Sequence, residues 1–306
     1  MHSVGIVLHP KRDSAEAVRA ILDWAAARNT PVYGLREEVT RLNCEAIAVS
    51  EEELGRRAEL IVSLGGDGTM LRAMRMADRS QASVLGVNLG KLGFLAEVDV
   101  PDLPAALSAI DAHQYTIEPR LAIDATRGTE TATAFNDAVL VRVPGNGGSA
   151  LVALRVAGHP FVSYAADAVI VATPTGSTAY SFSAGGPIVH PAVEALLVTP
   201  ASPHSAYNRG FVLSVEDEVA LDVLPASGRL AIEIDGQVIG YADPGDHVDL
   251  RARPGAARVI RLGRTTFYER ARRQLRLTDS AEIPPGYSDD GDGAAHAEPT
   301  QLSQQN

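Results

Sequence analysis

The sequence predicts an α/β N-terminal domain, in which helices flank a parallel sheet, followed by an all-β, sandwich-like second domain. Strand-like apolar runs alternate with helical patterns up to about residue 114. From about residue 115, short strand-like runs follow one another with glycine turns between them. The chain has 306 residues, enough for two domains. We expect an α/β domain at 1–114, a β-sandwich domain at 115–264, a helix at 265–279 and a disordered acidic tail at 280–306.

The first hundred residues hold the alternating elements. A capping box at Ser50 and Glu53 begins a short helix, and Pro101 lies in the first turn of another. The predicted strands are 3–8, 31–34, 60–64 and 83–87, and the other predicted helices end near 27 or span 69–79 and 101–112. Such alternation places the carboxyl ends of parallel strands at one edge of the sheet, where ligands bind.

The second part of the chain is a series of short strands and then a helix. The predicted strands are 115–126, 132–143, 150–157, 161–163, 167–172, 211–214, 218–223, 230–234, 247–251 and 258–262. Apolar residues at helical spacing predict a helix at 266–275. The segment 280–306 holds five acidic residues, a Pro-Pro pair and no Lys or Arg, a composition typical of disorder.

Composition narrows the functional class. The chain is 45% hydrophobic and 21% charged, as in an ordinary globular protein, and no apolar run is long enough to cross a membrane. The net charge of −11 argues against non-specific nucleic-acid binding. Cys44 is the only cysteine, and the N-terminus lacks the features of a signal peptide, so we expect a cytoplasmic protein. The eight histidines show no metal-ligand spacing, so we expect no structural metal.

A glycine turn, GGDGT at 65–69, joins the predicted strand 60–64 to the helix that follows. Glycines let a ligand approach the backbone, and a helix N-terminus suits phosphate. Asp67 inside this turn indicates metal contact or proton transfer, and Thr69 is the expected N-cap. The turn lacks the lysine and spacing of a P-loop. The alternative is a tight βα turn whose aspartate only caps the helix.

Two further polar segments stand out. The strand from Asp167 runs into TPTGSTAYSFSAGGP at 173–187, whose hydroxyl groups and glycines suit hydrogen bonding to sugars and phosphates. The alternative is an ordinary Ser/Thr-rich surface loop. Asn136 and Asp137 interrupt an apolar run, and buried polar groups need partners. Their partner is either a ligand or a local turn.

Taken together, these motifs resemble the bacterial NAD kinase family. GGDGT at 65–69, GVNLGKLGFLAEV at 86–98, the 173–187 motif, Asp235-Gly-Gln237 and the TFYER segment at 266–270 occur in the family's order and spacing, and the resemblance covers about residues 3–277. GGDG alone is also found in lipid kinases and phosphofructokinases, whereas the 173–187 motif is specific. The resemblance implies an enzyme that phosphorylates the adenosine 2′-hydroxyl of NAD, with ATP or polyphosphate as donor, to give NADP. It also implies that the C-terminal helix returns to the α/β domain.

The resemblance further assigns roles to residues. Asp67 would be the general base, and Gly65, Gly66, Gly68 and Thr69 would meet nucleotide phosphates bridged by a divalent metal such as Mg²⁺. Arg72 would touch an NAD phosphate. The remaining residues that would bind NAD are Asn136, Asp137, Asp167, Thr178, Ala179, Tyr180, Ser181, Phe182, Ser183 and Gln237. Some of them would come from a neighbouring subunit, so we expect a homo-oligomer, a dimer or tetramer, with no nucleic-acid or membrane partner.

Three departures from the family pattern bear on NAD binding. The usual Asn-Glu pair is Asn136-Asp137 here, the loop 144–148 carries no basic residue or histidine, and Ala165 replaces a residue that is often larger. They leave Asp67 intact. Two other functional classes stay open: a non-catalytic NAD sensor, which would be free to lose Asp67, and a lipid or sugar kinase of the wider GGDG superfamily, against which the 173–187 motif argues.

Overall fold

The computed structural model describes residues 2–78, 80, 82–90, 93–145, 148–204 and 207–277. Four sequence-based predictions lie partly outside the described residues: the end of the helix predicted to reach 79, positions 91–92 of the 86–98 motif, positions 146–147 of the loop 144–148, and positions 278–279 of the helix predicted at 265–279. The predicted tail, 280–306, lies wholly outside them.

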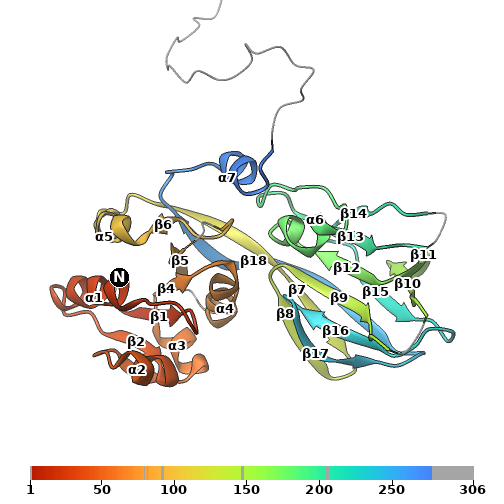
Figure 1. Cartoon of the computed structure of the whole chain (residues 1–306), viewed down its shortest axis with the longest axis horizontal. Coiled ribbons are helices and arrows are strands. Elements are labelled where there is room, and N and C mark those ends of the chain that lie inside the picture. Colours follow the sequence, from red (N-terminus) through yellow and green to blue (C-terminus); the bar gives the residue numbers. More distant parts are fainter. Residues whose placement is uncertain are drawn as a thin grey trace, which may run out of the picture.

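The N-terminal part is a parallel sheet with helices on both faces (Figure 1). Its strands are β1 (Val4–Leu8), β2 (Val32–Leu35), β3 (Ile47–Val49), β4 (Leu60–Gly65) and β5 (Ser83–Asn88), in the order β3-β2-β1-β4-β5. Its helices are α1 (Ala15–Ala26), α2 (Arg36–Leu42), α3 (Glu51–Arg57), α4 (Asp67–Ala77) and α5 (Leu103–Asp111), the last preceded by the short strand β6 (Val98–Asp99) and a 3₁₀ turn, Val100–Asp102. Strands β1, β4 and β5 are buried along their whole length, as their continuous apolar runs predict.

Two predictions in this part are corrected. Helix α4 begins at Asp67 with Gly66 as its N-cap, so Thr69 is not the cap but the third helical residue. Helix α2 and strand β3 were not predicted, because they are short and β3 is partly exposed, which leaves a weak hydrophobic period. The capping box at Ser50 and Glu53 is confirmed.

The second part packs two antiparallel layers around an apolar core (Figure 1). One layer is a six-stranded sheet of order β14-β13-β12-β9-β16-β17. Its strands are β9 (Asp137–Arg142), β12 (Ala168–Ala172), β13 (Ala195–Ala201), β14 (Phe211–Ser214), β16 (Leu230–Ile234) and β17 (Gln237–Ala242). The facing layer holds β7 (Thr116–Arg127), β8 (Glu130–Ala134), β10 (Ala150–Val156), β11 (His159–Ala166), β15 (Val219–Val223) and β18 (His247–Arg261). The predicted fold class is thus confirmed, while the domain boundaries remain a proposal.

Strand β18 joins the two parts into one continuous sheet of 12 strands. Its first half pairs with β15, and Arg258 and Val259 in its second half pair in parallel with β5. The two strands predicted at 247–251 and 258–262 are therefore one, and the run predicted at 132–143 is two, β8 and β9. The pairing of β18 with β7 shifts between Arg253 and Ala257, where Gly255 has φ of +67°, and this bulge breaks the apolar alternation that sequence reading relies on.

Two strands were missed. β13 is buried throughout, so its residues show no alternation, and it carries Pro200. β17 follows a tight turn in which Asp235 (φ +48°) and Gly236 (φ +76°) both take positive φ. Asp-Gly is a strong hairpin signal that would have found this strand. Helix α7 (Phe267–Gln274) lies where a helix was predicted, with a capping box at Thr266 and Glu269.

Candidate active site

Asp67 is held against the 86–98 motif. Its Oδ2 accepts the backbone N–H of Phe94 and its Oδ1 that of Leu95, each at 3.0 Å. A Cβ atom on Gly93 would lie 2.1 Å from Asp67 Oδ1, so only glycine permits this approach. Strands β4 and β5 are parallel neighbours with Gly65 opposite Asn88, which places both motifs at one carboxyl edge of the sheet.

The three glycines of the turn differ in their surroundings. A Cβ on Gly65 would lie 2.2 Å from Oγ1 of Thr69, which is buried, so these two residues pack against each other. Gly66 and Gly68 have no atom within 4 Å of an added Cβ. No side chain caps the first turn of α4, so this helix end can offer backbone N–H groups to an anion. The space in front of Gly66 and Gly68 is therefore suited to a phosphate group.

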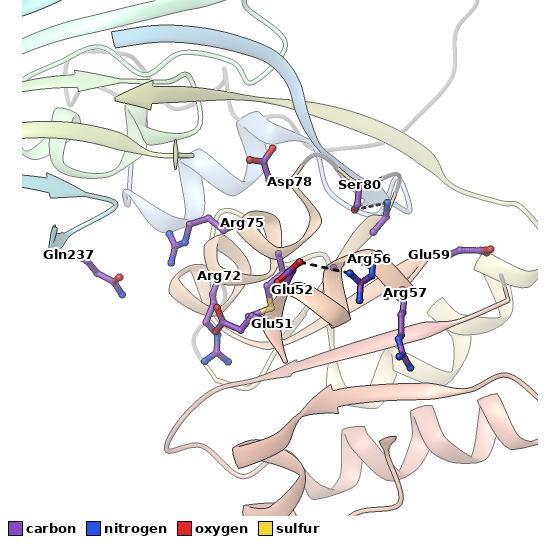
Figure 2. Close-up of a pocket in the computed structure, with 14 residues that line it drawn as sticks. Glu51, Glu52, Arg56, Arg57, Glu59, Arg72, Arg75, Asp78, Ser80 and Gln237 are labelled. Atoms are coloured by element: carbon purple, nitrogen blue, oxygen red, sulfur yellow. Dashed lines mark hydrogen bonds and ion pairs between the residues drawn. The ribbon is translucent and has the colours of Figure 1, made fainter. Parts of the chain in front are cut away.

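The next turns of α4 carry two arginines, Arg72 and Arg75. Arg72 donates to the carbonyl of Leu8 at 2.7 Å and pairs with the buried Glu38. Figure 2 places Arg72, Arg75 and Gln237 around a cleft of about 1110 Å³ on the flank of α4. Asp67 does not line this cleft. Arg56 of the lining pairs with Glu52, while Arg57 and Arg72 pair with Glu53 and Glu38 outside it. We therefore place the chemistry at the glycine turn rather than in the large cleft.

Asp235 organises the Asn136-Asp137 segment. Its Oδ1 accepts the backbone N–H groups of Phe135, Asn136 and Asp137 at 3.0, 2.7 and 3.3 Å. Its other oxygen lies 2.7 Å from Arg75 Nη1, and the side chain is 1% exposed. The sequence analysis assigned no role to Asp235 or Arg75.

The Asn136-Asp137 segment also contacts the 173–187 motif. Thr173 donates its N–H to the carbonyl of Asn136 at 2.8 Å and its hydroxyl to that of Phe135 at 2.6 Å. A Cβ on Gly176 would lie 2.1 Å from the Asn136 carbonyl oxygen. Asp137 pairs with Ala172 across strands β9 and β12. Residues 173–177 are buried, so the first half of the motif is not a surface loop.

Asp137 has an unusual electrostatic environment. Burial raises the pKa of its carboxyl to about 7, and the nearby carboxylates of Asp235 and Glu233 add to this rise, while a backbone hydrogen bond from Tyr180 opposes it. Burial, and then Glu233, Asp167 and Asp137, raise the pKa of the Tyr180 hydroxyl. Asp137 and Tyr180 therefore belong to one group of interacting polar side chains.

The remaining predicted residues divide into exposed and packed ones. Tyr180 begins the short helix α6 (Tyr180–Ser183) and is 37% exposed. Ser181 is fully buried and bonds to Thr199 Oγ1 at 2.9 Å, so it packs rather than faces a ligand. Asp167 pairs with Arg142 at 2.6 Å near the surface. The others, Thr178, Ala179, Phe182 and Ser183, are half-buried or exposed around α6.

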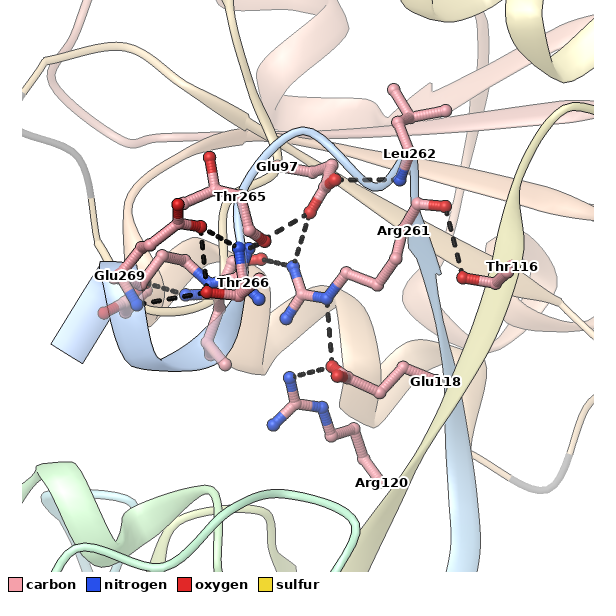
Figure 3. A network of polar contacts seen from close by, with 12 residues as sticks. Glu97, Thr116, Glu118, Arg120, Arg261, Leu262, Thr265, Thr266 and Glu269 are labelled. Atoms are coloured by element: carbon pink, nitrogen blue, oxygen red, sulfur yellow. Dashed lines mark hydrogen bonds and ion pairs between the residues drawn. The ribbon is translucent and has the colours of Figure 1, made fainter. Parts of the chain in front are cut away.

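A largely buried ionic network lies next to the segment that holds Asp67 (Figure 3). Arg261 Nη1 donates to Glu97 Oε2 and to the carbonyl of Leu95, both at 3.0 Å. Its Nε donates to Glu118 at 2.9 Å, and Glu118 also pairs with Arg120, which reaches Oγ1 of Thr175 at 3.0 Å. Since Leu95 bonds to Asp67, the network links β18 to the aspartate. Sequence reasoning missed it because its members lie far apart in the chain.

No group of three or more His, Cys, Asp or Glu side chains in the part of the chain that the structure describes is placed to hold a metal ion. Within the same residues, none of the helices has both the length and the apolar character that a membrane span needs.

Comparison with known families decides the assignment. Residues 4–115 match the model of the ATP-NAD kinase N-terminal domain, and residues 135–262 match that of the ATP-NAD kinase C-terminal domain. The chain belongs to the NAD kinase family. The expected family and enzyme class, a phosphotransferase, are thereby confirmed.

Individual relatives agree with this assignment. NAD kinase 1 of Streptomyces avermitilis is 38% identical over 316 residues, covering 90% of this chain and 88% of the relative. The NAD kinase of Desulforamulus reducens is 39% identical over 284 residues, covering 90% and 98%. Among solved structures, yeast NADH kinase complexed with NADH superposes with a TM-score of 0.77 at 25% identity, covering 90% of this chain and 87% of that one. An NAD kinase from Archaeoglobus fulgidus in complex with ATP gives 0.70 at 25% identity, covering 90% and 98%.

Proposed function

We propose that this NAD kinase family member transfers a phosphoryl group from ATP, or from inorganic polyphosphate, to the adenosine 2′-hydroxyl of NAD, giving NADP. The observation that carries the proposal is the open space at Gly66 and Gly68, beside Asp67 and in front of the first turn of α4. A phosphate there meets free N–H groups and a helix dipole, and it lies next to a carboxylate. Family membership supplies the acceptor, NAD.

In this proposal Asp67 is the general base. The N–H groups of Phe94 and Leu95 hold its carboxylate in one orientation, so no reorganisation is needed when the 2′-hydroxyl arrives. Asp67 takes the hydroxyl proton as the 2′-oxygen bonds to the terminal phosphorus of the donor, and the bond to the leaving phosphate breaks. A divalent metal, Mg²⁺ in our proposal, would neutralise charge on the donor phosphates. The carboxylate of Asp67 lies beside the space for phosphate, and Mg²⁺ is commonly held by one or two carboxylates plus substrate phosphates.

NAD would bind between the glycine turn and the β layers. Asn136, Asp137 and Tyr180 would contact its polar groups, and the Arg75–Asp235 contact keeps the two sides of this site together. Gln237 and Asp167 would lie at the edge of this NAD site. Ser181 would support it indirectly, through its hydrogen bond to Thr199. We also propose a homo-oligomer, dimer or tetramer, that works in the cytoplasm.

An assay of NADP formation tests the proposal. Purified protein receives NAD and Mg²⁺ with either ATP or polyphosphate, and NADP is measured with an NADP-specific dehydrogenase. We expect NADP to form in at least one of the two reactions. Comparing the reaction with ATP and the reaction with polyphosphate identifies the donor. Asp67→Asn should lower kcat at least about 100-fold, the usual scale for a general base, while NAD still binds. NAD binding by calorimetry without NADP formation from either donor would instead favour the sensor hypothesis.

A further inference from the structure

A basic cluster lies beside the glycine turn, at the carboxyl end of β1. It consists of Lys11, Arg12, Arg41 and Arg72 around His9. Burial and these four cations together lower the pKa of His9. The whole chain has a net charge of −11, so the positive charge gathered here contrasts with the charge of the whole chain.

The cluster adjoins the glycine turn through backbone contacts. His9 donates its N–H to the carbonyl of Leu64 at 2.8 Å, one residue before the turn, and Leu89 donates to that of Gly65 at 3.1 Å. The guanidinium of Arg12 covers Gly90, where a Cβ would lie 2.6 Å from Arg12 Nη1. Segments 9–12, 64–68 and 88–90 therefore lie next to one another at the sheet edge.

The loop that carries the cations is rigidly built. The ring Nδ1 of His9 accepts the backbone N–H groups of Lys11 and Arg12, both at 3.1 Å. Arg41 donates to the carbonyls of His9 and Pro10. These contacts hold the backbone of residues 9–12 in one conformation, from which the side chains of Lys11 and Arg12 extend into solvent.

Lys11 and Arg12 are not neutralised. Glu38 pairs with Arg72, and Asp13 accepts the N–H of Ala15. No acidic partner of Lys11 or Arg12 is found among the residues that the structure describes, and both side chains are exposed. Two exposed cations beside the glycine turn, without an acidic partner among the described residues, attract an anion.

We propose that Lys11 and Arg12, with Arg41 and Arg72 behind them, bind the inner phosphates of the donor, so that its phosphate chain extends from the glycine turn across segment 9–12. This rests on the proposed function and assigns the basic cluster to the donor rather than to NAD. Arginine and lysine side chains make charge-assisted hydrogen bonds to phosphate. A neighbouring cleft of about 270 Å³, lined by Ser14, Asn88 and Asp99 among others, leaves room for the rest of the donor.

The test compares Lys11→Ala, Arg12→Ala and the double variant with Arg19→Ala. Arg19 is an exposed arginine on α1, outside the cluster, and serves as the matched control. The double variant should raise KM for the donor about 10-fold or more, the equivalent of one lost hydrogen bond to a charged group, and leave KM for NAD within about twofold. Arg12→Lys should recover part of the loss. A higher KM for ATP alone would show that the cluster binds the phosphates of a nucleotide. A higher KM for both ATP and polyphosphate would show that it binds a phosphate chain whatever its source.

A second measurement does not depend on turnover. Calorimetry with inorganic tripolyphosphate and the full-length protein should show binding that the double variant weakens and Arg19→Ala does not. If no NADP forms but this difference persists, the proposed function fails and the anion site stands. Equal tripolyphosphate binding by the double variant and the control, or a rise in KM for NAD instead of the donor, would overturn the proposal.

Discussion

Arg75 on α4 and Asp235 in the β16–β17 turn form a contact of 2.7 Å that joins the helix of the glycine turn to the β layers. The same carboxylate holds the backbone of Phe135, Asn136 and Asp137. Breaking a buried pair leaves an uncompensated charge and costs about 3–5 kcal/mol. Asp235→Ala should therefore lower the free energy of unfolding by this amount. Arg75→Met should lower it by less, because the carboxylate of Asp235 then keeps its backbone N–H donors.

Urea denaturation measures these losses, and kinetics should show a higher KM for NAD in Arg75→Met. The control is Arg229→Met, which breaks an exposed pair with Asp243 and should leave the free energy of unfolding almost unchanged. Equal losses in Arg75→Met and Arg229→Met would mean that the Arg75–Asp235 contact has no special role.

Two glycines near Asp67 should respond differently to alanine. In Gly93→Ala the new Cβ would meet the Asp67 carboxylate, so we expect both a lower melting temperature and a loss of kcat. In Gly66→Ala the Cβ enters open space, so the fold should be kept while KM for the donor rises. Thermal melts and steady-state kinetics on both variants check this. Normal donor KM in Gly66→Ala would show that no phosphate approaches this residue.

Asp137 predicts a pH dependence of stability. Its pKa is raised from 3.8 to about 7 in the folded protein. The folded state therefore keeps the proton at higher pH than the unfolded state, so this contribution to stability is full below about pH 4 and is lost as pH rises to about 7. Asp137→Asn should remove this loss and be the more stable protein at pH 8.

Urea denaturation of the ligand-free protein between pH 4.5 and 8 measures the effect. The wild-type curve should fall relative to that of Asp137→Asn across this window. Parallel curves for the two proteins would show that Asp137 titrates normally.

The ionic network predicts a kinetic effect at a distance. Arg261 bonds to the carbonyl of Leu95, whose N–H bonds to Asp67. Arg261→Lys cannot keep the contacts to Glu97, Leu95 and Glu118 together, so we expect kcat to fall about 10-fold, as for one lost charged hydrogen bond, with little change in KM for NAD. The control is Arg264→Lys, in the same segment but paired with the exposed Asp102. The melting temperatures of both variants show whether a fall in kcat comes from unfolding instead. A rise in KM with normal kcat would argue against positioning of Asp67.

The sequence contained the local parts of the site. The strand, glycine turn and helix around Asp67 follow from apolar runs and from the conformational freedom of glycine, which act over a few residues. The motif at 173–187 and the Asn136-Asp137 pair were also visible. The exact start of the helix was predicted wrongly. The sequence predicted Thr69 as the N-cap, whereas the helix begins at Asp67 and Gly66 is its N-cap.

By itself, the sequence determined the family, the two kinds of domain and the motifs that bear the chemistry, since these are written in local residue patterns. Only the tertiary structure decided which residues meet: Arg75 with Asp235, Leu95 with Asp67, and Arg12 with Gly90. It also decided that one strand, β18, runs through both the N-terminal part and the second part. These contacts join residues that are distant in the chain, and their geometry depends on how sheets and helices pack, which no local pattern of side chains records.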